Sequence, residues 1–317
     1  MPELRNRLQS RAAALALIRD FFAKRDVLEV DTPVLSTATT PDPNLHSLTT
    51  RLACRPDVDW YLQTSPEFAM KRLLAAGSGD IYQIARVFRD GEIGALHQPE
   101  FTLIEWYRVG WDETRLIDEV IDLIAHLVPE GESQATGHTR ISYCDAFEQY
   151  CGLDPLTADQ SQLRQCATEH GLVVPSQDLD ATGLLDLMLS ALVAPHLGRD
   201  GPTVVFDFPA SQAALAQLKA NDQRVAARFE VFLRGVELAN GFRELTDPIE
   251  QRHRFTTELA QRQRHGLPAV TLDENFLAEL GALPPCSGVA LGFDRLLMLA
   301  NAEATVDAVM TLPVEKT

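Results

Sequence analysis

The sequence predicts an α+β fold, in which an antiparallel sheet is flanked by helices. Strand-like segments follow one another in pairs, with residues 81–88 before 101–109 and residues 228–235 before 236–242. Strands and helices do not alternate as the β-α-β units of a parallel sheet do. The chain has 317 residues, which is enough to bury a large core.

The N-terminal part predicts a helix, a short strand and then a second strand that leads into a helix. Leu8–Val27 has an apolar rhythm of helical period, and residues 27–30 are typical of a strand that Pro33 ends. Residues 60–64 predict the second strand. Ser65-Pro66-Glu67 then predicts a helix start, because serine caps helices, proline suits the first turn and glutamate favours its positive end.

The rest of the chain predicts further elements and their connections. Residues 75–80 form a glycine-bearing turn that lacks the Gly-Lys-Ser/Thr ending of a P-loop. The other elements follow in chain order: a loop at 91–98, a helix at 111–128, a surface linker at 129–139, a mainly helical region at 140–200, a strand at 203–208, a helix at 248–265, and a strand at 288–293 that runs into a helix from Asp294. The region 140–200 carries no chemistry that the sequence identifies.

Composition narrows the classes of function. No run of about 18 apolar residues is present, so no membrane partner is expected. The few, widely spaced cysteines suggest reduced thiols in a cytoplasmic protein; they are Cys54, Cys144, Cys151, Cys166 and Cys286. The net charge of −17 repels phosphate backbones at long range, which argues against nucleic acid as the main partner. Acidity that serves only solubility is the alternative.

Two segments nearly two hundred residues apart carry the most information. The first contains Val87–Glu92, His97–Thr102 and Glu105–Tyr107, and the second is Cys286–Leu296. Each sets one arginine among apolar strand residues, with carboxylates or aromatic rings beside it. Two separated arginines with acidic groups are what a bent triphosphate and its magnesium require. For either arginine alone, the alternative is an ordinary surface ion pair or a brace at a helix start.

Together, the two segments resemble the second and third signature motifs of class II aminoacyl-tRNA synthetases, and the residues around them resemble the lysine branch. The helix, strand and proline at the N-terminus are similar to the first motif, which builds the dimer interface of that family. The resemblance covers residues 15–299 and implies that residues 1–317 form one catalytic domain. It also implies a homodimer.

The resemblance implies that ATP is bound by residues of both motifs. Arg89 would contact the α-phosphate, and Phe101 would stack on the adenine. Arg295 would cap the other face of the adenine and reach the γ-phosphate, with His97 near the terminal phosphates. Arg89 and Arg295 are therefore the expected catalytic residues. The other expected nucleotide contacts are Asp90, Gly91, Gln98, Glu237, Leu238 and Gly292.

The expected magnesium ligands are Glu230 and Glu237. They stand seven residues apart on neighbouring strand-like segments, and hard oxygen ligands of this kind hold magnesium against phosphate oxygens. Two solvated surface glutamates are the alternative. The string Val236–Leu245 favours the magnesium site, because it resembles the segment of lysyl-tRNA synthetases that carries a metal-binding glutamate.

The amino-acid site is implied by the same family resemblance. Asn240 matches the residue that holds the substrate carboxylate, Glu244 and Tyr107 those that grip the ε-ammonium, and Glu67 the one that reads an amino group. Ser65, Pro66 and Ala290 complete the expected substrate-binding set. Two acids and a phenol predict a cationic substrate with two amines. A relative that activates aspartate would need an arginine in place of Glu244.

The implied reaction needs no nucleophile from the protein. The substrate carboxylate attacks the α-phosphorus in line and pyrophosphate leaves, helped by positioning and charge neutralisation. An anticodon-binding domain is not expected in this chain, and Ala290 stands where lysyl-tRNA synthetases carry glycine. Both features resemble a paralogous branch that transfers activated (R)-β-lysine to a lysine ε-amine of elongation factor P.

Some positions depart from the family pattern, and alternatives stay open. Gly91 stands where a glutamate is usual, Ala95 and Leu96 where an arginine is frequent, and Gln98 where asparagine is usual. These changes affect an adenine contact and a γ-phosphate contact. The alternatives are a truncated enzyme that charges tRNA and a non-catalytic regulatory paralogue that binds an amino acid. The choice between lysine and β-lysine as donor is also open.

Overall fold

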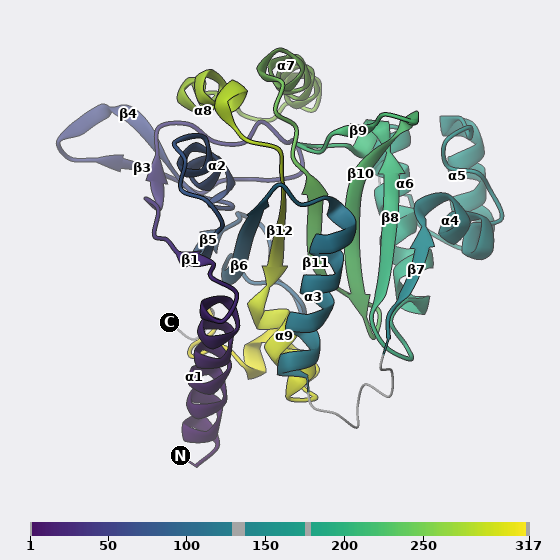
Figure 1. Ribbon diagram of the computed structural model, residues 1–317. Helices are drawn as coiled ribbons and strands as arrows, with labels where there is room; N and C mark the ends of the chain where they lie inside the picture. The colour runs from purple at the N-terminus through teal and green to yellow at the C-terminus, as the bar shows by residue number, and fades with distance from the viewer. Residues whose placement is uncertain (1, 129–136, 175–178, 315–317) are drawn as a thin grey trace. The chain divides into compact units, whose positions relative to one another are not determined.

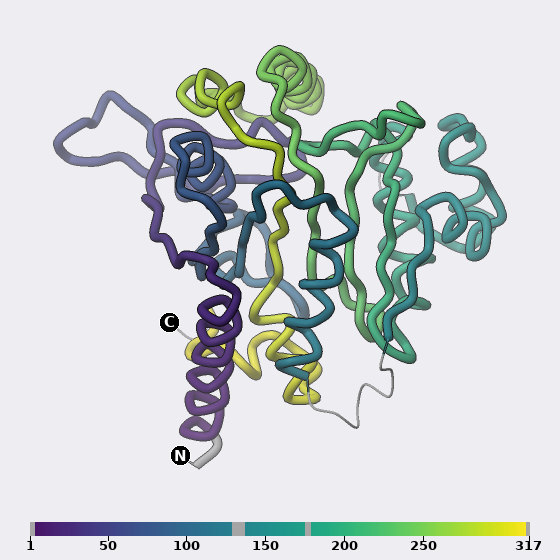
Figure 2. The backbone as a smooth tube through the Cα atoms, viewed as in Figure 1, coloured from purple at the N-terminus to yellow at the C-terminus, as the bar shows by residue number. Residues whose placement is uncertain are grey.

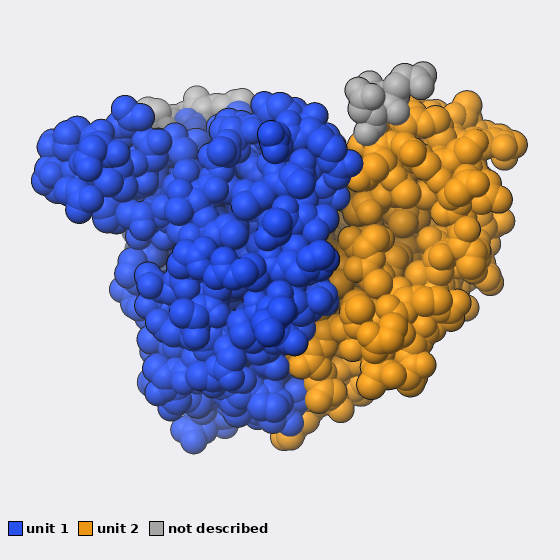
Figure 3. All heavy atoms as spheres, turned by 90° about the horizontal axis from the view of Figure 1, so that it is seen from above, with its two compact units in different colours: residues 1–111, 126–128, 245–317 blue, residues 112–125, 129–244 orange. Residues whose placement is uncertain are grey.

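The computed structural model describes residues 2–128, 137–174 and 179–314, which fall into two compact units. Unit 1 comprises Met1–Trp111, His126–Val128 and Leu245–Thr317, and unit 2 comprises Asp112–Ala125 and Pro129–Glu244. Figure 3 colours unit 1 blue and unit 2 orange. The chain therefore leaves unit 1 after Trp111 and is again in unit 1 from Leu245 to its end. Figure 2 traces this path along the backbone.

Unit 1 contains four strands of the large sheet (Figure 1), in the order β1 (Leu28–Glu29), β5 (Ile81–Phe88), β6 (Glu100–Val109) and β12 (Cys286–Gly292). β5, β6 and β12 pair antiparallel, whereas β1 pairs parallel with β5. A second small sheet has the order β2 (Leu35–Ser36), β4 (Arg55–Leu62) and β3 (Thr49–Leu52). The two long motifs identified in the sequence thus lie on adjacent strands.

Helices and aromatic rings build the core of unit 1. The helices are α1 (Pro2–Ala23), α2 (Glu67–Ala75), α7 (Pro248–Arg264), α8 (Glu274–Glu279) and α9 (Phe293–Ala300). Phe22 of α1 stacks on Tyr82 of β5 with ring centroids 4.3 Å apart, and it meets Trp106 of β6 edge-on. Since all three side chains are buried, α1 is held on the sheet mainly by apolar contact.

Unit 2 contains strands in the order β11 (Val236–Arg243), β10 (Asp222–Leu233), β8 (Thr203–Pro209) and β7 (Thr139–Ser142), with β9 (Leu218–Lys219) paired to β10. All these pairs are antiparallel except β7 with β8. Its helices are α3 (Glu113–Leu127, whose last residues belong to unit 1), α4 (Tyr143–Cys151), α5 (Gln160–Glu169) and α6 (Ala181–Met188). Apolar side chains of α4, α5 and α6 form one buried cluster with Val205, Phe208 and Phe232 of the sheet.

A β-bulge between β10 and β11 decides which way Glu237 points. Glu230 lies opposite Asn240, and Val231 lies opposite Ala239. Regular alternation would place Leu238 opposite Phe232, but the observed partner of Phe232 is Glu237. The extra residue on β11 therefore turns Glu237 to the same face as Glu230 and Asn240.

The predicted α+β class with a mainly antiparallel sheet is confirmed, and most predicted elements are present within a few residues. The pairs β1–β5 and β7–β8 are parallel, which the sequence did not predict. The cap prediction at Ser65 was wrong by one residue, because Pro66 is the N-cap and α2 begins at Glu67. Most of the predicted linker, residues 129–136, lies outside the described residues. Within the described residues, no helix is long and apolar enough to cross a membrane.

Asp294 joins three elements of unit 1 through buried polar contacts. Its Oδ1 accepts a hydrogen bond from Arg11 Nη1 of α1 at 2.6 Å, and its Oδ2 accepts one from the backbone N–H of Thr102 on β6 at 2.7 Å. Arg11 also donates to the Thr102 hydroxyl. Asp294 is thus the brace at the start of α9, which leaves the neighbouring Arg295 for other contacts.

We expect Asp294→Ala to lower the free energy of unfolding by about 3–5 kcal/mol, because it leaves the buried guanidinium of Arg11 without its carboxylate. Urea titration followed by circular dichroism measures this change. Asp20→Ala is the control, since Asp20 pairs with Lys24 at an exposed site and should contribute far less. Similar losses in the two variants would contradict the assigned role of Asp294.

Candidate active site

Arg89 and Phe101, predicted to contact the nucleotide, lie together in unit 1. Arg89 follows β5, and Phe101 lies opposite Val87 on β6. The guanidinium carbon is 5.0 Å from the centre of the Phe101 ring, and Nε donates to the carbonyl oxygen of Thr64 at 3.3 Å. The strand register therefore presents a ring and a cation side by side, which suits a base next to a phosphate.

Arg295 and His97, each expected near the terminal phosphates, are in contact with one another. Arg295 Nη2 lies 2.7 Å from His97 Nε2, and Nε donates to the carbonyl oxygen of Leu96 at 3.2 Å. The side chain of Arg295 packs beside Gly292, where an added Cβ atom would lie 3.6 Å from the Cδ atom of Arg295, an ordinary van der Waals distance. The loop at 91–98 is thus held against the start of α9.

The same loop is tied to the C-terminal segment through Gln98. Gln98 is buried and donates from Nε2 to Asp307 Oδ1 at 2.8 Å, so its side chain serves as an anchor of the loop. Its predicted contact with the nucleotide stays a prediction. The backbone carbonyl of Ala95, at a position where the family often has arginine, accepts from the N–H of Val306 at 2.9 Å.

Gly91, which stands where the family usually has a glutamate, differs from it in backbone conformation as well as in side chain. Gly91 has φ +80°, a conformation that favours glycine. The carboxylate near Arg89 comes from Glu92 instead, with Oε1 3.7 Å from Arg89 Nη1. Asp90, also predicted at the nucleotide, has an exposed side chain and donates its backbone N–H to the carbonyl of His46.

A buried polar cluster in unit 1 connects α2 with β6. Ser65 Oγ donates to Glu105 Oε2 at 2.6 Å and accepts from the backbone N–H of Glu67, while Tyr107 Oη donates to Glu105 Oε1 at 2.7 Å. Lys71 Nζ donates to Glu67 Oε1 at 2.6 Å and is only 1% exposed. Pro66 lies between these groups in the chain, as the residue before α2.

Sequence reasoning assigned Ser65, Glu67 and Tyr107 but missed Glu105 and Lys71. The available signal for Glu105 was a carboxylate flanked on both sides by the large apolar residues Ile104 and Trp106 of a predicted strand. For Lys71 it was the spacing of four residues from Glu67 on one helix. Ala290, predicted near the amino end of the substrate, lies directly opposite Glu105 on β12.

The environment of Glu105 favours its protonated form. Burial raises the pKa of Glu105 to about 7, and the nearby charge of Glu67 adds to this, while the hydrogen bonds from Ser65 and Tyr107 act in the opposite direction. A cationic group placed beside Glu105 would stabilise the carboxylate. The cluster therefore suits an ammonium ligand.

In unit 2, Glu230, Glu237 and Asn240 share one face of the β10–β11 pair. Burial and the charge of Glu237 raise the pKa of Glu230 to about 8, although Arg228 Nη2 contacts Glu230 Oε1 at 2.6 Å. Two close carboxylates that the protein neutralises only in part suit a hard divalent cation. Glu230 and Glu237 would therefore suit a magnesium ion, which would supply positive charge at this face of the sheet.

Glu244 and Leu238, the remaining predicted residues of unit 2, are both buried. The Glu244 side chain is 0% exposed, and its backbone bridges to Ala216. The Leu238 side chain is buried, so its contact with a nucleotide would come from its backbone. Burial of Glu244 makes its charge costly unless a cation is close.

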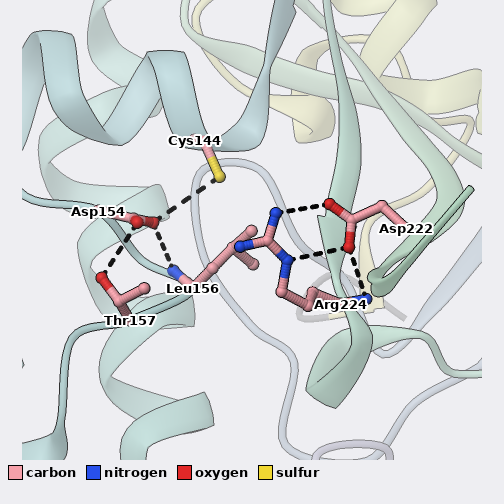
Figure 4. A network of polar contacts seen from close by, with 6 residues as sticks. All are labelled: Cys144, Asp154, Leu156, Thr157, Asp222 and Arg224. Atoms are coloured by element: carbon pink, nitrogen blue, oxygen red, sulfur yellow. Dashed lines mark hydrogen bonds and ion pairs between the residues drawn. The ribbon is translucent and has the colours of Figure 1, made fainter.

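Figure 4 shows further polar contacts of unit 2, made by residues 144–157 of the predicted helical region and by the first residues of β10. Asp154 accepts from the backbone N–H of Leu156 and from the hydroxyl of Thr157, and the Cys144 thiol lies 4.0 Å from its Oδ1. Arg224 pairs with Asp222 at the start of β10. None of the predicted site residues takes part in these contacts.

The chain belongs to the class II aminoacyl-tRNA synthetase family of the aspartate, lysine and asparagine type. The model of this family, described as tRNA synthetases class II (D, K and N), matches residues 1–316.

Among the relatives of known name, several are named elongation factor P–(R)-β-lysine ligase. The protein of Hamiltonella defensa is 47% identical over 314 residues, covering 98% of this chain and 95% of the relative. That of Yersinia enterocolitica is 48% identical over 312 residues, covering 97% and 94%. That of Salmonella typhimurium is 47% identical over 308 residues, covering 95% and 93%.

We expect the free energy of unfolding to fall less steeply with rising pH in Glu105→Gln than in the wild-type protein. The raised pKa of Glu105 means that the folded state binds more protons than the unfolded state between about pH 4.5 and 7, so wild-type stability falls across that window. Urea titrations of both proteins at several pH values give the difference curve. A difference that does not depend on pH would show that Glu105 is already ionised throughout.

Proposed function

We propose that this protein activates (R)-β-lysine, or lysine, with ATP as an adenylate and transfers it to a lysine ε-amine of elongation factor P. The observation that carries the proposal is the state of Tyr107. Towards the ionised carboxylate of Glu105 it donates its single hydroxyl proton, so its oxygen is then left as an acceptor towards a ligand. Together with the carboxylate of Glu67, this favours a substrate amine over a neutral or acidic side chain.

The near full-length similarity to ligases of this name supports the protein acceptor. In the first step the substrate carboxylate attacks the α-phosphorus of ATP and pyrophosphate leaves. In the second step the lysine amine attacks the adenylate carbonyl, which forms an amide and releases AMP. Arg89 and Arg295 would neutralise and orient the phosphates in the first step. Magnesium, held by Glu230 and Glu237, would supply further charge neutralisation.

Charging of tRNA is the second candidate, favoured by the family itself. The net charge of −17 argues against it, because it opposes the approach of a polyanion. A non-catalytic regulatory paralogue would need the amino-acid site but not the nucleotide contacts proposed for the Arg89–Phe101 and Arg295–His97 pairs. The homodimer and the cytoplasmic location stay predictions.

Incubation of this protein with ATP, (R)-β-lysine and elongation factor P should add one β-lysyl group to elongation factor P, read by intact-mass spectrometry. Lysine in place of β-lysine identifies the preferred donor. Arg89→Met should abolish the gain, since it removes the cation beside Phe101. Arg86→Met is the matched control, because Arg86 lies three residues earlier, near the end of β5, and pairs with Glu100 at an exposed site.

No mass gain together with efficient charging of lysine tRNA would replace the first candidate by the second. No gain, no charging and no amino-acid-dependent pyrophosphate exchange would favour the regulatory paralogue.

Glu244→Gln should raise the KM for the amino acid at least about tenfold and leave the KM for ATP within about twofold, because a buried charge pair is lost only with the amino acid. Pyrophosphate exchange at varied concentrations of each substrate measures both constants. Glu279→Gln is the control, since Glu279 pairs with Arg72 at a partly exposed site. Equal increases in the two KM values would contradict the proposed role of Glu244.

A further inference from the structure

Arg228 of β10 is a residue to which neither the sequence motifs nor the proposed function assigns a role. Each of its three guanidinium nitrogens has a different partner. Nη2 contacts Glu230 Oε1 at 2.6 Å, Nε donates to Asn240 Oδ1 at 3.2 Å, and Nη1 donates to the carbonyl oxygen of Gln212 at 2.7 Å. The guanidinium carbon also lies 4.4 Å from the centre of the buried Phe208 ring.

The strand register explains why one arginine reaches both Glu230 and Asn240. Arg228 and Glu230 are two residues apart on β10, so they share a face of the sheet. Asn240 lies directly opposite Glu230 on β11, which makes it the diagonal neighbour of Arg228. The ring below and three acceptors around the plane leave the guanidinium little freedom to rotate.

Fixing the guanidinium also fixes the orientation of the Asn240 amide. Oδ1 faces the Nε–H donor of Arg228, and the flipped amide would set its own N–H groups against that donor. The Nδ2 group is therefore turned away from Arg228 with its two hydrogens. An amide in this orientation can donate to a carboxylate, whereas the flipped amide would present a carbonyl oxygen and repel it.

We propose that Arg228 is a positioning residue that locks the Asn240 amide in the orientation that binds the carboxylate of the amino-acid substrate. This rests on the proposed function, in which Asn240 holds that carboxylate. The contact with Glu230 gives Arg228 a second consequence, because the same guanidinium occupies Oε1 and leaves Oε2 of Glu230 for a cation. One side chain thus sets the geometry of the amino-acid contact and of the adjacent acidic pair.

A pair of substitutions separates the hydrogen bond to Asn240 from the charge of Arg228. Lysine places a methylene group where arginine has Nε, so Arg228→Lys keeps the charge and loses the donor to Asn240. Glutamine places an amide nitrogen at that position, so Arg228→Gln loses the charge and keeps a donor. Methionine also has a carbon atom at the position of Nε. Arg228→Met therefore replaces Arg228→Lys if thermal unfolding shows that Arg228→Lys does not fold.

Binding of three ligands is measured by titration calorimetry: lysine, (R)-β-lysine and L-lysinol. L-lysinol is the amino alcohol that lacks the carboxylate of lysine. Arg228→Lys should weaken binding of the amino acids at least about tenfold and change binding of L-lysinol less than about twofold. Arg228→Gln should retain more amino-acid affinity than Arg228→Lys does. In an Asn240→Ala background, Arg228→Lys should cause no further loss.

Arg224→Lys is the matched control, because Arg224 lies four residues earlier on the same strand and pairs with Asp222 at the surface. It should leave binding of all three ligands unchanged. Equal losses for the amino acids and L-lysinol, no loss at all, or equal losses in Arg228→Lys and Arg228→Gln would overturn the positioning role. If the wild-type protein binds neither amino acid, the proposed function fails first and this role falls with it.

Discussion

The cost of burying carboxylates is the constraint on which the rest of this structure depends. Glu105, Glu230 and Glu244 are almost completely shielded from water, and such groups are stable as anions only beside cations or several donors. The protein supplies such cations and donors only in part. Lys71 lies at Glu67, and Arg228 lies at Glu230, yet the pKa values of Glu105 and Glu230 stay raised. The remaining charge makes both clusters receptive to a cationic ligand or a metal ion.

Backbone register, more than loop shape, sets where these carboxylates lie. Glu105 and Tyr107 point to one face of β6 because they are two residues apart, and Tyr107 can therefore donate to Glu105. On β11, regular alternation would have turned Glu237 away from Glu230, and one extra residue corrects this. The polar clusters thus rest on strand geometry, which is stiffer than a loop and suits groups that must stay within hydrogen-bond range.

The fold class and most elements could be predicted from the sequence, since each depends on local patterns, whereas the places of Arg295 and His97 were expected from the resemblance to a family. Arg89 comes beside Phe101 because β5 and β6 pair antiparallel with Phe101 opposite Val87, and Arg295 follows a strand rich in small residues. The bulge at Glu237 could not be predicted, because alternation in the sequence says nothing about an unpaired extra residue. Glu105 was overlooked for a related reason: its partner Ser65 is forty residues away, and only tertiary packing brings the two together.

The chain's own cations also lower the cost of burying the acidic cluster of each unit. Lys71 engages Oε1 of Glu67, and Arg228 engages Oε1 of Glu230, so in each cluster one oxygen is satisfied from within the chain. A ligand cation that approaches the other oxygen then completes the neutralisation without displacing the residue already there. Strongly bound internal cations would compete with the substrate if they took both oxygens, and an acid left wholly unpaired would be protonated. Engaging a single oxygen leaves the other oxygen accessible to a ligand cation, and the pKa of Glu230, still raised to about 8, shows that neutralisation by Arg228 alone is incomplete.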